Sequence, residues 1–199
     1  MSKKSEEIFD KFKHKEVSLT RAIKNFIDPG DRIFIGSGCA EPTELTKKLT
    51  ELGPELPDVQ MIHFLNLSDL DYYKTVGTVK DLFRHNVFFI GENLREPIAE
   101  GQADYTPMLL SEIPKLFKSG KIHLDTALIQ VSMPDKYGFC SYGMNVDIVK
   151  PLAEEAEHVV AEINPNMPRT LGDSFIHMDD IDACVRTDQL PFEFTYESD

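Results

Sequence analysis

The apolar positions of this chain gather in short unbroken runs, separated by stretches with helical spacing. A run without alternation is typical of a strand buried on both faces of a parallel sheet, because neither face turns toward water. The sequence therefore predicts strands over residues 32–35, 59–65, 87–90, 127–131 and 158–163.

The stretches between these runs space their apolar residues as one face of a helix requires. Pro29 and Gly30 are expected to end the first helix, and Pro42 to begin the second, where its missing N–H group costs nothing. The predicted helices cover residues 18–27, 43–52, 108–117 and 149–156.

Strands and helices thus alternate along the chain, an order typical of parallel strands joined by helical crossovers. We expect an α/β fold with three layers, in which helices flank a mainly parallel sheet. Near the end of the chain, Ile181, Ala183 and Val185 alternate with aspartates and a cysteine. This alternation predicts a further strand with one face toward water.

The length of 199 residues suits one α/β domain with its own core. We assign residues 1–190 to this domain. Residues 191–199 contain a proline and have an acidic end, so we predict that they form a linker.

Charge and cysteine usage narrow the possible functions. The 21 Lys and Arg residues face 34 Asp and Glu residues, a net charge of −13. This field repels polyanions, so nucleic-acid binding is not expected, and an anionic ligand would need local donors.

No stretch has the length and apolarity of a membrane span, so we expect a soluble protein without a membrane partner. The distant thiols of Cys39, Cys140 and Cys184 are odd in number, which favours reduced cysteines and a cytoplasmic location.

Candidate chemistry follows the predicted strands, because ligands of a parallel α/β sheet bind beyond the carboxyl ends of its strands. Four of the segments after predicted strands combine glycine, proline and polar residues, and we expect them to share one edge of the sheet. These segments are residues 36–42, 91–93, 132–138 and 164–169.

The first of these segments carries two glycines that would let the backbone approach a ligand closely. Gly36 and Gly38 precede a predicted helix, whose free N–H groups attract negative charge. A dinucleotide fingerprint would need a third glycine where Glu41 stands, and no P-loop motif occurs. A tight turn that needs glycine for steric reasons alone explains the pattern equally well, so both interpretations stay open.

The segment over residues 132–141 places two hydroxyl groups and a thiol just after a buried strand, where loops often contact substrate. The alternative is a turn through Pro134 and Gly138, with Cys140 packed as a small hydrophobic residue. On the residues alone, this alternative is favoured.

Two carboxylates, Glu41 and Glu92, follow predicted strands and are candidates for a nucleophile or a base. The simpler explanations are a helix-start carboxylate for Glu41 and a polar loop residue for Glu92, and we favour both. The six histidines lack the spacing of a zinc motif, so no metal site is predicted.

Several segments together resemble one family. The segments 31–45, 83–86, 101–107, 128–141, 166–170 and 172–177 are similar, in the same order, to the amino-terminal half of 4-hydroxybutyrate CoA-transferases, in the acetyl-CoA hydrolase/4-hydroxybutyrate CoA-transferase family. The resemblance covers roughly residues 20 to 190.

The resemblance implies a CoA-transferase architecture of two similar halves with the active site between them. It implies transfer of coenzyme A between an acyl-CoA and a short carboxylic acid, of the acetate or 4-hydroxybutyrate type, through a glutamyl-CoA intermediate. The family's nucleophilic glutamate lies in a His-Ser-Glu context in the second half. That motif is absent here, so no catalytic residue is assigned to this chain. Coenzyme A would be a substrate, and no permanently bound cofactor is expected.

The resemblance also implies which residues form this half's wall of the acyl and CoA site. The expected partners are acyl-CoA, a short carboxylate, a missing carboxy-terminal domain beyond the linker, and further copies of the chain in a homo-oligomer such as a dimer. The expected site residues are Gly36, Ser37, Gly38, Cys39, Glu41, Pro42, Tyr105, Pro107, Ser132, Pro134, Gly138, Cys140 and Ser141.

Three other functions stay open at this point. One is a non-catalytic module that binds CoA thioesters, and another is an acyl-CoA hydrolase. The third is an enzyme of similar fold, such as a sugar-phosphate isomerase, in which Glu41 or Glu92 would act as a base.

Overall fold

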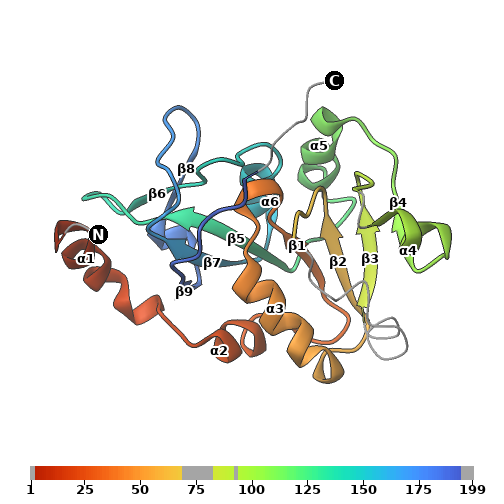
Figure 1. Ribbon diagram of the computed structural model, residues 1–199, viewed down its shortest axis with the longest axis horizontal. Coiled ribbons are helices and arrows are strands. Elements are labelled where there is room, and N and C mark those ends of the chain that lie inside the picture. Colours follow the sequence, from red (N-terminus) through yellow and green to blue (C-terminus); the bar gives the residue numbers. More distant parts are fainter. Residues whose placement is uncertain (1–2, 69–82, 92–93, 194–199) are drawn as a thin grey trace.

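The computed structural model describes residues 3–68, 83–91 and 94–193, and its main feature is a parallel sheet. Within this part of the chain, seven strands pair in the order β4-β3-β2-β1-β5-β7-β9, and β6 pairs antiparallel with β8 in a separate small sheet (Figure 1). The strands are β1 Arg32–Ile35, β2 Val59–His63, β3 Phe83–Val87, β4 Ala103–Tyr105, β5 Thr126–Ser132, β6 Phe139–Ser141, β7 His158–Asn164, β8 Phe175–His177 and β9 Ala183–Arg186.

Short helices connect the strands and cover both faces of the sheet. In Figure 1, α1 and β4 lie at opposite ends of the molecule. The α-helices are α1 Lys3–Phe9, α2 Leu19–Lys24, α3 Thr43–Leu52, α4 Arg95–Ala99, α5 Ile113–Lys118 and α6 Val149–Glu155. The 3-10 helices are η1 Asp10–Lys15, η2 Gly38–Ala40, η3 Gly53–Glu55, η5 Leu110–Glu112 and η6 Met178–Asp180.

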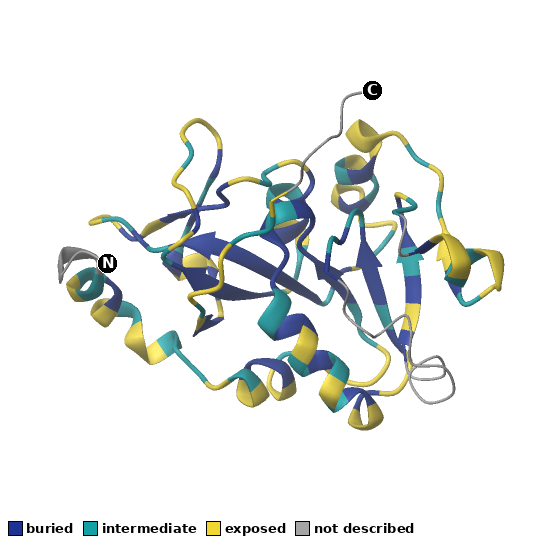
Figure 2. Cartoon of the chain, viewed as in Figure 1, coloured by how far each residue is buried: buried dark blue, intermediate teal, exposed yellow. Residues whose placement is uncertain are grey.

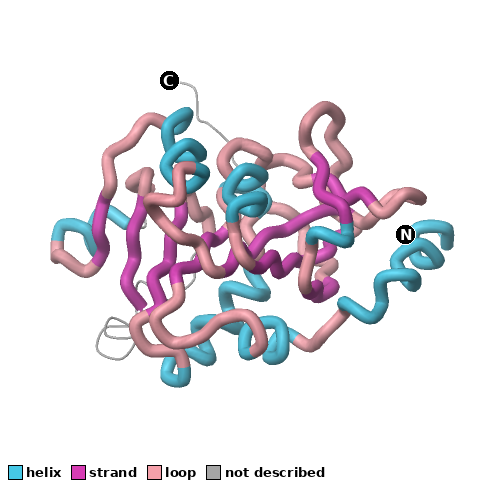
Figure 3. Tube along the Cα trace, turned by 180° about the vertical axis from the view of Figure 1, so that it is seen from behind, coloured by secondary structure: helices cyan, strands magenta, loops and turns pink. Residues whose placement is uncertain are grey.

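Successive residues of each central strand enter two different cores. Phe34 packs with α5 and α6, whereas its neighbours Ile33 and Ile35 pack with α2 and α3. In β5, Ile129 and Leu128 divide in the same way. The central strands β1 and β5 are largely dark blue and the outer sides of the helices largely yellow in Figure 2, and Figure 3 gives the same arrangement from behind. The prediction of three layers around a mainly parallel sheet is confirmed.

The predicted elements differ from the observed ones where burial is uneven. β1 and α3 have their predicted bounds, but the strand predicted over 87–90 lies at Phe83–Val87. Its pattern is broken, because Arg84 is exposed and pairs with Asp58. α5 begins at Ile113, with Pro114 in its first turn, rather than at residue 108.

The prediction of a wet face on the last strand is wrong. Ala183, Cys184 and Val185 are all buried. The amino-terminal segment covers this edge, because Val17 donates its N–H to the Cys184 carbonyl at 2.9 Å. That contact joins residues far apart in sequence, so a local pattern of polar and apolar positions does not reveal it.

Candidate functional site

The order of the strands creates a switch point between β1 and β5. From β1 the chain moves outward through β2, β3 and β4, and then returns to place β5 on the other side of β1. A crevice at such a point, beyond the carboxyl ends of the strands, is the usual ligand site of an open α/β sheet. The segment 36–42 follows β1 and the segment 132–138 follows β5, so two of the predicted segments flank this point.

The glycines after β1 are required by close neighbours. Gly36 donates its N–H to the Leu128 carbonyl at 2.8 Å, and a Cβ on Gly36 would lie 3.2 Å from that oxygen. Gly38 has a φ of +61°, and a Cβ there would lie 2.5 Å from the Asn145 side chain. Asn145 in turn accepts a hydrogen bond from the Cys39 N–H at 3.0 Å. The steric explanation for these glycines is therefore confirmed, while a ligand-binding role stays a prediction.

Replacing Gly38 with alanine is expected to lower the free energy of unfolding by about 2–4 kcal/mol, because the left-handed backbone and the contact with Asn145 both oppose a Cβ. Gly120 has a φ of +69°, and a Cβ added there would have no neighbour within 4 Å, so Gly120→Ala reports the backbone cost alone. Urea denaturation of both variants measures the difference. Equal losses of stability in the two variants would show that the Asn145 side chain moves aside without an energetic cost.

Ser37 lies between these glycines and is fully buried. Within the described part of the chain, its Oγ has no hydrogen-bond partner. An unpaired buried hydroxyl group costs about 1–3 kcal/mol, so its retention calls for an explanation, of which a functional role is one. The hydroxyl group is thus a free donor beside the switch point.

The Glu41 carboxylate ties together the loops that follow β1 and β2. It accepts hydrogen bonds from the N–H groups of Leu67 and Ser68 at 2.9 and 3.1 Å, and also from the Ser68 hydroxyl group. Burial raises the pKa of Glu41, although these hydrogen bonds act in the opposite direction. The helix-start explanation is therefore incomplete, because the carboxylate binds a neighbouring loop.

A second buried carboxyl group, which is not among the predicted site residues, belongs to Glu162 of β7. It accepts the Leu45 N–H at 2.7 Å in the first turn of α3, and it is fully buried. Burial raises the pKa of Glu162 to about 8, so the group is largely protonated at neutral pH. In the sequence, Glu162 could be noticed as a lone carboxylate within an otherwise apolar strand.

Gln130 connects the Glu162 carboxyl group to the main chain of Glu41. Its amide nitrogen donates to the Glu41 carbonyl at 3.0 Å and contacts the Glu162 carboxyl group at 3.4 Å. Its amide oxygen accepts from Asn164 at 3.0 Å. This network therefore fixes the ends of β5 and β7 against the loop after β1.

Two histidines lie buried beside this network. His63 Nδ1 is 3.1 Å from Asn66 Oδ1, and His63 Nε2 is 3.4 Å from His85 Nδ1. Burial lowers the pKa of His63 to about 3 and that of His85 to about 4. Both rings are therefore neutral at physiological pH.

The remaining predicted residues after β5 build the small sheet. Ser132 Oγ accepts the Ser141 N–H at 2.9 Å, and Ser141 Oγ accepts the N–H groups of Gly143 and Thr170. Cys140 is buried, and burial raises the pKa of its thiol. This placement agrees with the turn and small-hydrophobe explanation for the segment.

The other predicted site residues lie in two separate parts of the fold. Pro134 and Gly138 are buried in the turn before β6. Tyr105 and Pro107 are exposed at the end of β4, on the outer edge of the sheet and apart from the switch point. Glu92 lies outside the described residues.

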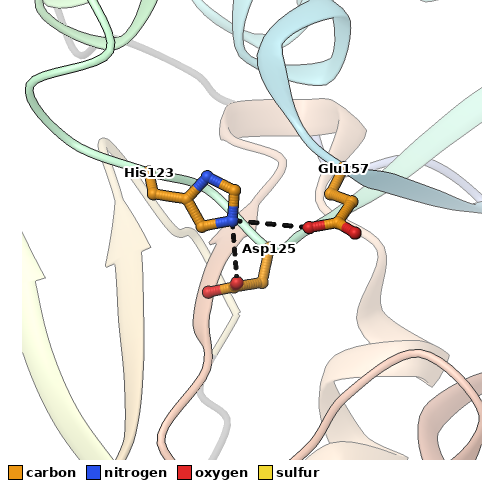
Figure 4. Close-up of side chains that lie close together, drawn as sticks. All are labelled: His123, Asp125 and Glu157. Carbon is orange, nitrogen blue, oxygen red and sulfur yellow. Dashed lines mark ion pairs between the residues drawn. The ribbon is translucent and has the colours of Figure 1, made fainter.

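Among the described residues, three side chains of types that can bind a metal ion lie close together at the amino ends of β5 and β7. His123 Nε2 is 3.0 Å from Asp125 Oδ1 and 3.5 Å from Glu157 Oε2 (Figure 4). No known zinc spacing joins these residues in sequence, so a search for motifs does not find them.

The comparisons with known proteins agree on the family. The model of the acetyl-CoA hydrolase/transferase N-terminal domain matches residues 1–195. The 4-hydroxybutyrate coenzyme A transferase of Clostridium kluyveri is 42% identical over 174 residues, which are 87% of this chain and 40% of that protein. A CoA transferase of Fasciola hepatica, named for succinyl-CoA:acetate and propanoyl-CoA:succinate exchange, is 40% identical over 158 residues, which are 78% of this chain and 32% of that protein.

A solved structure supports the same assignment. The 4-hydroxybutyrate CoA-transferase of Porphyromonas gingivalis superposes with a TM-score of 0.74 at 25% identity, over 95% of this chain and 43% of that one. This chain thus spans less than half the length of these relatives. Among the described residues, no helix is long and apolar enough to cross a membrane. The chain belongs to the acetyl-CoA hydrolase/transferase family, and it corresponds to the family's N-terminal domain.

Proposed function

We propose that this chain supplies one wall of the active site of a CoA-transferase, which moves coenzyme A from an acyl-CoA to a short carboxylic acid. The observation that carries the proposal is the pair of loops at the β1–β5 switch point, in a chain of this family. The curated relatives named above are CoA transferases of 4-hydroxybutyrate, succinate and acetate type, which supports this substrate class.

The reaction would use a glutamate carboxylate from a carboxy-terminal domain. This carboxylate attacks the thioester carbonyl, the C–S bond breaks, and a mixed anhydride and CoA thiolate result. The thiolate then attacks the glutamyl carbonyl, which gives glutamyl-CoA and releases the first acid. The acceptor acid reverses both steps.

In this scheme the present chain binds and orients rather than reacts. The loop after β1 would line the wall that faces the thioester, and Glu41 would hold the loop after β2 in place. The binding roles of Tyr105, Pro107 and the segment 132–141 are part of the proposal. So are a cytoplasmic location, a homo-oligomer and a linker over 191–199.

The structure of Glu41 argues for this scheme over catalysis by this chain. Its carboxylate is buried and accepts three hydrogen bonds from the loop at Leu67 and Ser68. A base that abstracts a proton needs an oxygen within reach of the substrate. Glu41 therefore fits an anchor better than the base of an isomerase.

The test is a mass measurement on the gene product purified from its source cells and incubated with acetyl-CoA without acceptor. We expect a covalent adduct of one CoA less one water, on a peptide outside residues 1–199, which disappears when 4-hydroxybutyrate is added. The 199-residue chain alone serves as the control and should give no adduct and no turnover. Turnover by this chain alone, or an adduct on Glu41, would contradict the proposal.

A further inference from the structure

The amino edge of the sheet brings together three side chains with metal-ligating atoms. His123 and Asp125 immediately precede β5, and Glu157 immediately precedes β7. The register Thr126↔His158 sets Asp125 and Glu157 side by side. The backbone around them is fixed, because the Glu157 N–H donates to the Leu124 carbonyl at 3.0 Å and the His158 N–H to that of Asp125 at 2.9 Å. The sheet itself therefore positions these donors.

The distances between the donor atoms suit a tetrahedral ion. His123 Nε2 lies 3.0 and 3.5 Å from carboxylate oxygens of Asp125 and Glu157, and all three donor atoms lie within 4.8 Å of one another. Donors bound to zinc at about 2.0–2.2 Å in a tetrahedron are roughly 3.3–3.6 Å apart. The two distances from His123 lie close to this range, and the two carboxylate oxygens lie within 4.8 Å of each other.

A contact outside the triangle orients one of the donors. Asp125 Oδ2 accepts the Arg32 N–H at 2.7 Å, which leaves Oδ1 directed at His123. Outer hydrogen bonds of this kind typically orient the ligands of a metal. The Arg32 guanidinium group is engaged with Gln60 and with the His123 carbonyl. Among the ion pairs of the described residues, both carboxylates pair with His123 alone.

We propose that His123, Asp125 and Glu157 bind a divalent transition-metal ion such as zinc, with water as the fourth ligand. The ion joins the starts of β5 and β7. The side chains of His123 and Glu157 are 64% and 62% exposed, so the ion enters from solvent without opening the fold. Two carboxylates with one imidazole match the oxygen and nitrogen ligands that zinc accepts.

The test is a titration of the EDTA-treated, dialysed 199-residue chain with zinc chloride at neutral pH, followed by calorimetry and thermal unfolding. We expect one ion per chain and a higher Tm with zinc, because an ion that binds only the folded state stabilises it. Cobalt in place of zinc should give the visible absorption of a four-coordinate site. His123→Ala and Glu157→Gln should each weaken zinc binding by about tenfold or more.

The controls are His14→Ala, which removes an exposed histidine of η1, and Cys39→Ser, which removes the partly exposed thiol. Both should bind zinc as the unchanged chain does. Circular dichroism in EDTA checks that every variant is folded. Absence of zinc binding by the unchanged chain would overturn the proposal. Equal zinc affinity in His123→Ala would overturn it as well.

Discussion

Replacing Glu162 with glutamine is expected to remove a pH-dependent loss of stability. The folded state keeps the Glu162 proton up to a pKa of about 8, whereas the unfolded carboxyl group ionises near 4.5. Between these values the folded state holds more protons, so the free energy of unfolding falls as pH rises, by up to about 1.4 kcal/mol per pH unit. The stabilising contribution is complete below pH 4.5 and lost near pH 8. The glutamine amide does not titrate, so the variant should lack this decline.

Urea denaturation of both proteins from acidic to mildly alkaline pH measures the effect, as the difference between the two free energies of unfolding. The difference should favour the variant increasingly up to about pH 8 and then stay constant. The control is Glu7→Gln, at an exposed position of α1, whose free energy of unfolding should change with pH in the same way as that of the unchanged chain. A parallel profile for Glu162→Gln would show that Glu162 is ionised in the folded protein.

Replacing Glu41 with alanine is expected to lower the free energy of unfolding by about 2–6 kcal/mol, because the N–H groups of Leu67 and Ser68 lose their acceptor and each unsatisfied donor costs about 1–3 kcal/mol. Glu41→Gln keeps an oxygen for both donors, and the Ser68 hydroxyl group can turn to accept from the new amide. The glutamine variant should therefore lie within about 1 kcal/mol of the unchanged chain.

Measuring both variants also separates an anchoring role from a catalytic one. Chemical denaturation gives the stability, and CoA-transfer assays of the complete protein give the activity. An anchor predicts that Glu41→Gln keeps both stability and turnover. A stable glutamine variant without turnover would instead identify Glu41 as a reacting group, and equal destabilisation by both substitutions would point to packing rather than hydrogen bonding.

Much of the central sheet is predictable because its strands are buried on both faces. β1, β5 and β7 appear as mainly apolar runs without alternation, and the segments after β1 and β5 are recognisable as candidate ligand sites for that reason. The prediction for β3 is displaced because its pattern alternates through Arg84. β6 and β8 are not predicted, because each is three residues long and they pair across a long stretch of sequence.

The candidate site is predictable in position but not in its connections. Gly36, Gly38 and Glu41 stand out in the sequence, since they directly follow a buried strand, where the ligands of a parallel sheet bind. Their neighbours Asn145, Gln130 and Glu162 come from distant segments that only the folded chain places beside them. A single carboxylate in an apolar run gives no sign of which helix it will contact.

The sequence by itself determined the α/β class, the alternation of layers, and the family to which the chain belongs. These follow from local periodicity, which acts over a few residues at a time, and from the order of short motifs along the chain. Only the tertiary structure decided that β5 returns beside β1, that Glu162 meets the start of α3, and that His123 meets Asp125 and Glu157. Those contacts depend on strand order and register, and many strand orders are compatible with the same local pattern.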